Sequence, residues 1–88
     1  MRAPIQRPNL SCREIDGQTI IVDLNGKRMF HGLNETAALL FKNCDGTQDI
    51  ESLVKIMMDS YQVDSEMAKA DTAEILEQFE DLELISYD

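Results

Sequence analysis

The residues Thr19-Ile-Ile-Val-Asp-Leu-Asn-Gly-Lys-Arg-Met-Phe30 have the pattern of a β-hairpin, and the expected order of the sheet follows from them. Asn25-Gly26 is a strong signal for a two-residue turn, since both residues tolerate the positive φ that a type I′ turn requires. The strand before this turn, residues 18–24, carries apolar side chains on both faces, which is typical of a central strand. The strand after it, residues 27–31, is therefore expected at an edge of the sheet.

A third strand precedes these two. Residues 10–15 have strand character, and Asp16-Gly17 predicts a turn that leads into the central strand. If both turns have two residues, Cys12 faces Ile21, and Ile21 faces Phe30 on its other side. The simplest sheet is a meander in chain order, with the first and third strands at its edges.

After Gly32 the spacing of the apolar residues changes from two to about 3.6, which predicts helices. Asn34, Asp49 and Asp64 each stand where an N-cap is expected. The residues predicted to face the core are Ala37, Leu40, Phe41 and Cys44, then Ile50, Leu53, Val54, Met57 and Tyr61, then Ala68, Thr72, Ile75, Phe79 and Leu82. Strands followed by helices indicate an α+β domain with a three-stranded antiparallel sheet and three helices.

Length and composition limit the possible classes of protein. The 88 residues suffice for one domain, residues 9–88, and the two prolines in residues 1–8 indicate a flexible N-terminal arm. No apolar run is long enough for a membrane span, and the N-terminus lacks the apolar stretch of a signal peptide, so a cytoplasmic location is expected. The cysteines Cys12 and Cys44 lack a metal-site spacing, and neither a metal nor a cofactor is expected.

The charge of the chain is unevenly distributed. Residues 1–28 contain five basic and three acidic side chains, whereas residues 29–88 contain three basic and fourteen acidic ones. The helical part would repel a phosphate backbone, and the third helix, with one lysine and no arginine, is unsuited to reading DNA. Nucleic acid is therefore excluded as a partner.

Catalysis finds little support in the sequence. His31 is the only histidine, and no cysteine or serine near it in sequence forms a nucleophile pair. Glu51-Ser52-Leu53 is similar to the attachment site of acyl carrier proteins, but a β-hairpin is foreign to a four-helix carrier. A protein without enzymatic activity is the better interpretation.

The edge strand leaves two interpretations open. Its charges, Lys27 and Arg28, could simply protect a short edge from aggregation. Alternatively, an extended peptide could add to the edge as a further strand, with pockets beside it that select side chains. A third possibility is a small winged-helix module that dimerises or binds proteins through its strand edges.

Several segments together resemble the PqqD family of small peptide chaperones, whose domain is also called the RiPP precursor peptide recognition element. The similarity covers about residues 10–86 and is strongest in Gly32-Leu-Asn-Glu-Thr-Ala37, followed by Cys44-Asp-Gly46 and Tyr61-Gln-Val-Asp64. The chain departs from the family pattern at Phe41, where tryptophan is common, and at Glu83, where glycine is common.

The resemblance implies a winged-helix-like domain that binds the leader of a ribosomally made precursor peptide. The leader would add to the third strand in a groove completed by the third helix, and the domain would present it to a modifying enzyme, such as a radical SAM enzyme or a leader peptidase. Lys27, Arg28 and Lys69 would attract acidic leader side chains, and the protein would be a monomer or weak dimer. The implied peptide-binding residues are Lys27, Arg28, Met29, Phe30 and His31 on the strand, and Lys69, Thr72, Ala73, Leu76 and Glu77 on the helix.

Overall fold

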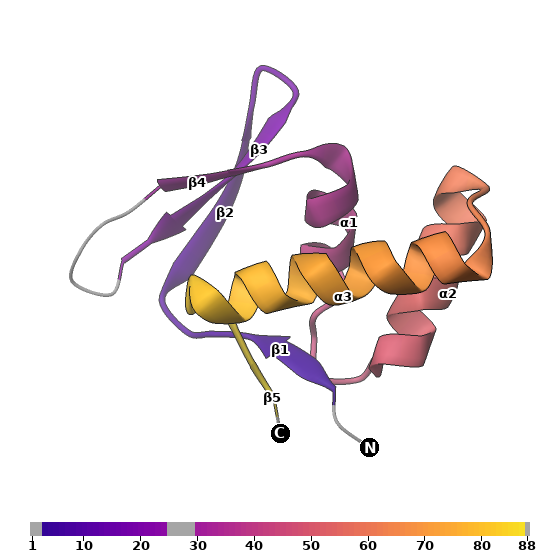
Figure 1. Ribbon diagram of the computed structural model, residues 1–88. Helices are drawn as coiled ribbons and strands as arrows, with labels where there is room; N and C mark the ends of the chain where they lie inside the picture. Colours follow the sequence, from indigo (N-terminus) through magenta and orange to yellow (C-terminus); the bar gives the residue numbers. More distant parts are fainter. Residues whose placement is uncertain (1–2, 25–29, 88) are drawn as a thin grey trace.

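The computed structural model describes residues 3–24 and 30–87, with the side chain of residue 30 excepted. Two small antiparallel sheets and three helices surround one core (Figure 1). The elements in chain order are β1 (Pro4–Gln6), β2 (Leu10–Ile15), β3 (Gln18–Asp23), β4 (Phe30–Leu33), α1 (Glu35–Lys42), α2 (Ile50–Tyr61), α3 (Ser65–Asp81) and β5 (Ile85–Tyr87).

The larger sheet has the predicted order β2-β3-β4, with β3 in the centre. Its first hairpin turns at Asp16 and Gly17, whose φ angles of 53° and 79° are those that a type I′ turn requires. Cys12 pairs with Ile21 as the sequence predicts. Ile21 is fully buried beneath the sheet, whereas the preceding residue, Ile20, is half-buried on the outer face, so β3 is apolar on both faces as expected.

The register of the edge strand differs from the prediction by one residue. Ile21 pairs with His31 rather than with Phe30, and Val22 pairs with Phe30. The described part of β4 ends at Leu33, two residues beyond the predicted end at His31. The Asn25-Gly26 turn itself lies outside the described residues.

All three predicted helix N-caps are confirmed. The side chains of Asn34, Asp49 and Asp64 each accept a hydrogen bond from a backbone N–H in the first turn of the helix that follows. At the other end of α2, Gln62 adopts the left-handed conformation with a φ of 51°. These caps fix where the three helices begin and where α2 ends.

The core lies between the inner face of β3 and the three helices. Phe41 of α1 and Phe79 of α3 meet edge to face with their ring centroids 5.6 Å apart. Most of the predicted inward residues are buried, but Ile50, Tyr61 and Leu82 are more than a third exposed. Ile50 and Tyr61 are the first and last residues of α2, and Leu82 is the C-cap of α3, so at all three positions the apolar stripe extends past the core.

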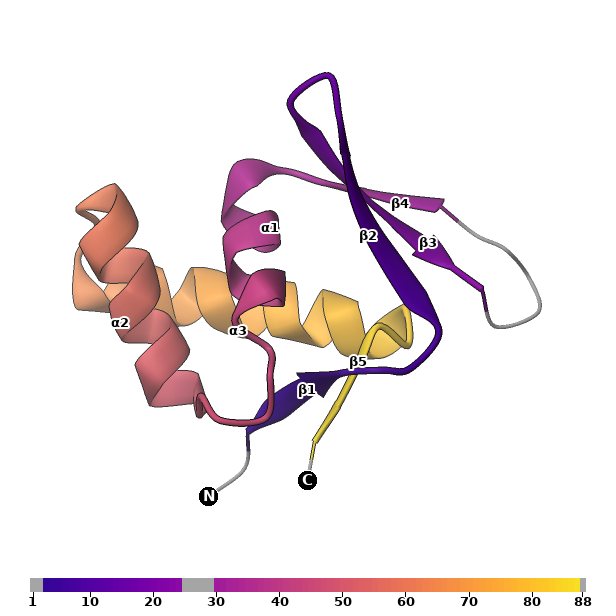
Figure 2. The same ribbon diagram turned by 180° about the vertical axis from the view of Figure 1, so that it is seen from behind.

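A flexible arm was expected over residues 1–8, but the described residues 3–8 include a strand. Residues Pro4–Gln6 form β1, which pairs with β5, and Ala3 is buried. Pro4 has no N–H to donate, but the first residue of a strand tolerates this loss. The N-terminal and C-terminal segments therefore form one sheet that closes the bottom of the core in both views (Figures 1 and 2).

Candidate functional site: the β4 edge and α3

The strand β4 has one paired edge and one edge that no described residue pairs with. Its paired edge faces β3, and the described strands give it no other neighbour. An unpaired edge exposes a row of backbone N–H and C=O groups, which can accept an additional strand. Which hydrogen-bonding groups this edge offers to a partner depends on which residues of β4 direct their backbone N–H and C=O groups outward.

The outward residues follow from the hairpin that precedes β4. A two-residue turn makes Ile15 and Gln18 a hydrogen-bonded pair, and such pairs recur at every second residue. The amide of Leu24 donates to the carbonyl of Asn9 at 2.9 Å, in the same phase as Gln18. The backbone groups of the intervening odd-numbered residues, such as Ile21, therefore face β4.

The same alternation shows which residues of β4 direct their backbone groups to β3 and which direct them outward. His31 and Leu33 stand opposite Ile21 and Thr19, so their backbone groups bond to β3. Phe30 and Gly32 consequently direct their N–H and C=O groups to the open edge. An added peptide strand would bond to these two residues, and its side chains would alternate between the two faces of the sheet.

The helix α3 runs on the same side of the molecule as β4. In Figure 1, β4 passes in front of β2 and α3 passes in front of α1, and Figure 2 shows both relations reversed. Between α3 and the residues that follow β4 lies an open hollow of about 280 Å³. It is lined by Asn34, Thr36, Asp71, Glu74, Ile75 and Gln78.

The strand residues named in the prediction are only partly described. Lys27, Arg28 and Met29 lie outside the described residues, and for Phe30 only the backbone is described, within β4. His31 is half-buried on the inner face of the sheet, opposite the buried Ile21. His31 is not among the residues that line the hollow.

Two of the predicted helix residues are buried in the core. Thr72 is 0% exposed, and its hydroxyl donates to the Sδ atom of Met57 at 3.9 Å. Leu76 is 2% exposed. The expectation that these two side chains contact a peptide does not fit their burial, because the stripe of α3 that faces the core includes position 76 as well as position 72.

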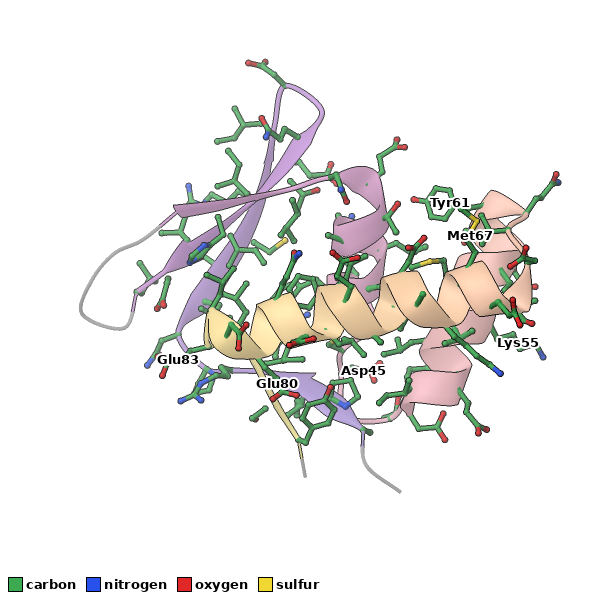
Figure 3. The ribbon with its side chains drawn as sticks, in the orientation of Figure 1. Asp45, Lys55, Tyr61, Met67, Glu80 and Glu83 are labelled. Carbon is green, nitrogen blue, oxygen red and sulfur yellow. The ribbon has the colours of Figure 1, made fainter. Side chains whose placement is uncertain are left out.

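Lys69 and Ala73 are exposed, but they lie on another side of α3. At about 100° per residue, Lys69 is about 120° around the helix from Ile75 and within about 20° of Glu80. Figure 3 shows Glu80 on the side of α3 that faces β1, away from β4. The structure therefore does not bring Lys69 to the hollow beside β4.

The helix residues that line the hollow were not predicted as site residues. Ile75 was assigned to the core, and Asp71, Glu74 and Gln78 were not assigned a role. Ile75 and Asp71 are half-buried and flank the buried stripe on one side. These residues can be recognised only when the structure shows which side of α3 faces β4. The helix sequence alone does not show which side that is.

The described residues contain little other chemistry. Within residues 3–24 and 30–87, no group of three His, Cys, Asp or Glu side chains is arranged to hold a metal ion. Burial and the nearby Asp45 carboxylate raise the pKa of Cys44 to about 12, which keeps it an unreactive thiol. None of the described helices is long and apolar enough to cross a membrane.

Comparison with known proteins places the fold. Residues 18–85 match the family described as "Coenzyme PQQ synthesis protein D (PqqD)". The solved structure "TbiB1 in Complex with the TbiA(beta) Leader Peptide" has a TM-score of 0.81 at 17% identity, over 93% of this chain and 94% of that chain. "Lasso peptide synthetase B1 complexed with the leader peptide" has a TM-score of 0.82 at 19% identity, over 94% and 96%. No curated protein matches the sequence.

Proposed function

Since the chain belongs to the PqqD family, we propose that it is a non-catalytic chaperone that binds the leader segment of a ribosomally made precursor peptide. The leader adds as a strand to the open edge of β4, and the domain presents it to a modifying enzyme. The observation that carries this proposal is the pairing of β4 with β3 alone among the described strands, beside a hollow bounded by α3.

The backbone geometry supports strand addition. Phe30 and Gly32 direct their N–H and C=O groups outward, and two such residues spaced by one are the repeat that an antiparallel or parallel strand recognises. The inward side chains of the leader would lie against His31 and Ile75, and main-chain hydrogen bonds would supply affinity without selecting a sequence.

The similar solved structures support the same assignment. Both are complexes with leader peptides, and both share the fold over more than nine-tenths of this chain. The alternative, a dimerisation module without a leader, gains no support from them. The wider expectations, a cytoplasmic location and a radical SAM enzyme or leader peptidase as partner, belong to this proposal.

Titration of isotopically labelled protein tests the proposal directly. The titrant is the leader segment of the precursor peptide encoded beside the gene, and backbone amide chemical shifts are followed by NMR. We expect the largest changes at residues 30–33 and at the α3 residues that line the hollow. If the peptide binds but its largest changes fall on α2 or on β1 and β5, the site is wrong. Absence of binding to this leader contradicts the function.

A further inference from the structure

The hollow between α3 and the start of α1, directly after β4, is acidic, although the protein was expected to attract acidic leaders. Asp71 and Glu74 both line it, three residues apart on the same side of α3. No described residue forms a hydrogen bond or an ion pair with either carboxylate, and the only described salt bridge joins Lys42 to Glu14.

The rest of the lining suits a long basic side chain. Ile75 offers an apolar surface for an aliphatic stem, and Thr36 and Gln78 offer uncharged oxygen atoms that can accept hydrogen bonds. None of the lining residues is basic. A leader carboxylate at this position would face two like charges, whereas an ammonium or guanidinium group would face two opposite ones.

We propose that the leader carries a lysine or arginine whose side chain enters this hollow, with its stem on Ile75 and its charged group between Asp71 and Glu74. This inference rests on the proposed function, because strand addition to β4 is what brings a leader side chain to the hollow. It assigns Asp71 and Glu74 as residues that determine which leaders bind.

A selection from random peptides tests the inference without knowledge of the natural leader. Phage-displayed peptides of about 12 random residues are selected on the immobilised wild-type protein. A parallel selection uses the double variant Asp71→Asn/Glu74→Gln, which keeps the size and the hydrogen-bonding capacity of the two side chains. The matched control is Asp59→Asn/Glu80→Gln, which removes the same charge from two exposed residues that do not line the hollow.

We expect lysine or arginine to be enriched at one position of the peptides selected on the wild type and on the control. Binding of a resynthesised peptide should weaken about tenfold in the Asp71→Asn/Glu74→Gln variant and change less than about twofold in the control. Its lysine-to-norleucine analogue should bind both double variants and the wild type with similar, weaker affinity.

The other outcomes of the selection distinguish a failure of this inference from a failure of the proposed function. Peptides that shift the amide signals of His31 and Gly32 but carry no enriched basic residue overturn the inference and leave the proposed function intact. Equal weakening in the two double variants overturns it as well, since it would show a general effect of net charge. Selected peptides that leave the β4 signals unchanged contradict the proposed function itself.

Discussion

The strands β1 and β4 are both short and both antiparallel, yet their edges differ. One edge of β1 pairs with β5, and its other edge is also occupied: Gln6 donates to the carbonyl of Cys44 at 2.9 Å, and Gly46 donates to the carbonyl of Pro4 at 3.0 Å. The outer edge of β4 has no such partner among the described strands. A strand with both edges occupied can only stabilise the fold, whereas a strand with an open edge can also bind.

The largest expected effect comes from breaking the closed region. Ile85 of β5 is 3% exposed, and the substitution Ile85→Ala should lower the free energy of unfolding by about 2–5 kcal/mol, because it leaves a cavity in the core. Urea denaturation measures this loss. Ser86→Ala, at the exposed neighbouring position, is the control and should change stability by less than about 0.5 kcal/mol. Similar losses in the two variants would contradict the structural role of β5.

The second prediction breaks the open edge. Gly32→Pro removes an outward N–H and should weaken leader binding at least about tenfold, because one main-chain hydrogen bond is lost and the ring obstructs the edge. Calorimetric titration measures the affinity. Gly32→Ala keeps the N–H and should bind normally, since its added Cβ meets only the flexible Gln18 side chain, at 3.1 Å from Nε2.

Proline substitution also tests which residues of β4 direct their N–H groups outward and which direct them to β3. His31→Pro removes an N–H that faces β3, so it should lower the stability of the domain rather than affect the leader alone. If proline at position 31 spares the fold and abolishes binding while proline at position 32 has no effect on binding, the outward residues are assigned to the wrong phase.

A smaller effect is expected from the side of α3 that faces β4. Ile75→Ala should weaken leader binding about fivefold, because it shortens the apolar surface of the hollow. Lys69→Ala should leave the affinity within about twofold of the wild type, although the sequence favoured Lys69. A larger loss from Lys69→Ala than from Ile75→Ala would mean that the peptide lies on the opposite side of α3.

The smallest effect near neutral pH is the contribution of the Cys44 thiol to stability. The carbonyl of this residue accepts the hydrogen bond from Gln6 at the closed edge of β1. Its pKa is raised from 9.0 to about 12 by burial, so between these values the unfolded chain releases the thiol proton while the folded chain keeps it. Stability should therefore be independent of this thiol below pH 9 and fall from pH 9 towards 12. Unfolding curves of the wild type and Cys44→Ala should show the shallower fall in the variant.

The sequence predicted those parts of the fold that depend on local patterns. Turn chemistry gave the hairpin at Asp16-Gly17, and the three N-caps gave the starts of the helices, because each signal lies within a few residues of its effect. The strand β1 was missed because its pairing with β5 joins segments about 80 residues apart. Three apolar or small residues such as Ala3, Pro4 and Ile5 do not distinguish a loose arm from a short strand.

The site was predicted less well, for the same reason. The sequence identified β4 as an edge, since β3 is apolar on both faces and must be central. It did not fix the register of β4, because the Asn25-Gly26 signal predicted Ile21 opposite Phe30, whereas Ile21 pairs with His31. It also did not show which side of α3 faces β4, and this side distinguishes Ile75 from Lys69.

The pairing of β1 with β5 also determines how the protein can be handled. Pro4 and Tyr87, near the two ends of the chain, pair with each other in the sheet at the bottom of the domain in both views, away from β4 (Figures 1 and 2). A fluorescent protein, an affinity tag or a surface linker attached at either end would therefore leave the β4 edge accessible. Immobilisation through either terminus should therefore attach the protein on the side away from β4 and keep the open strand available to a peptide in solution.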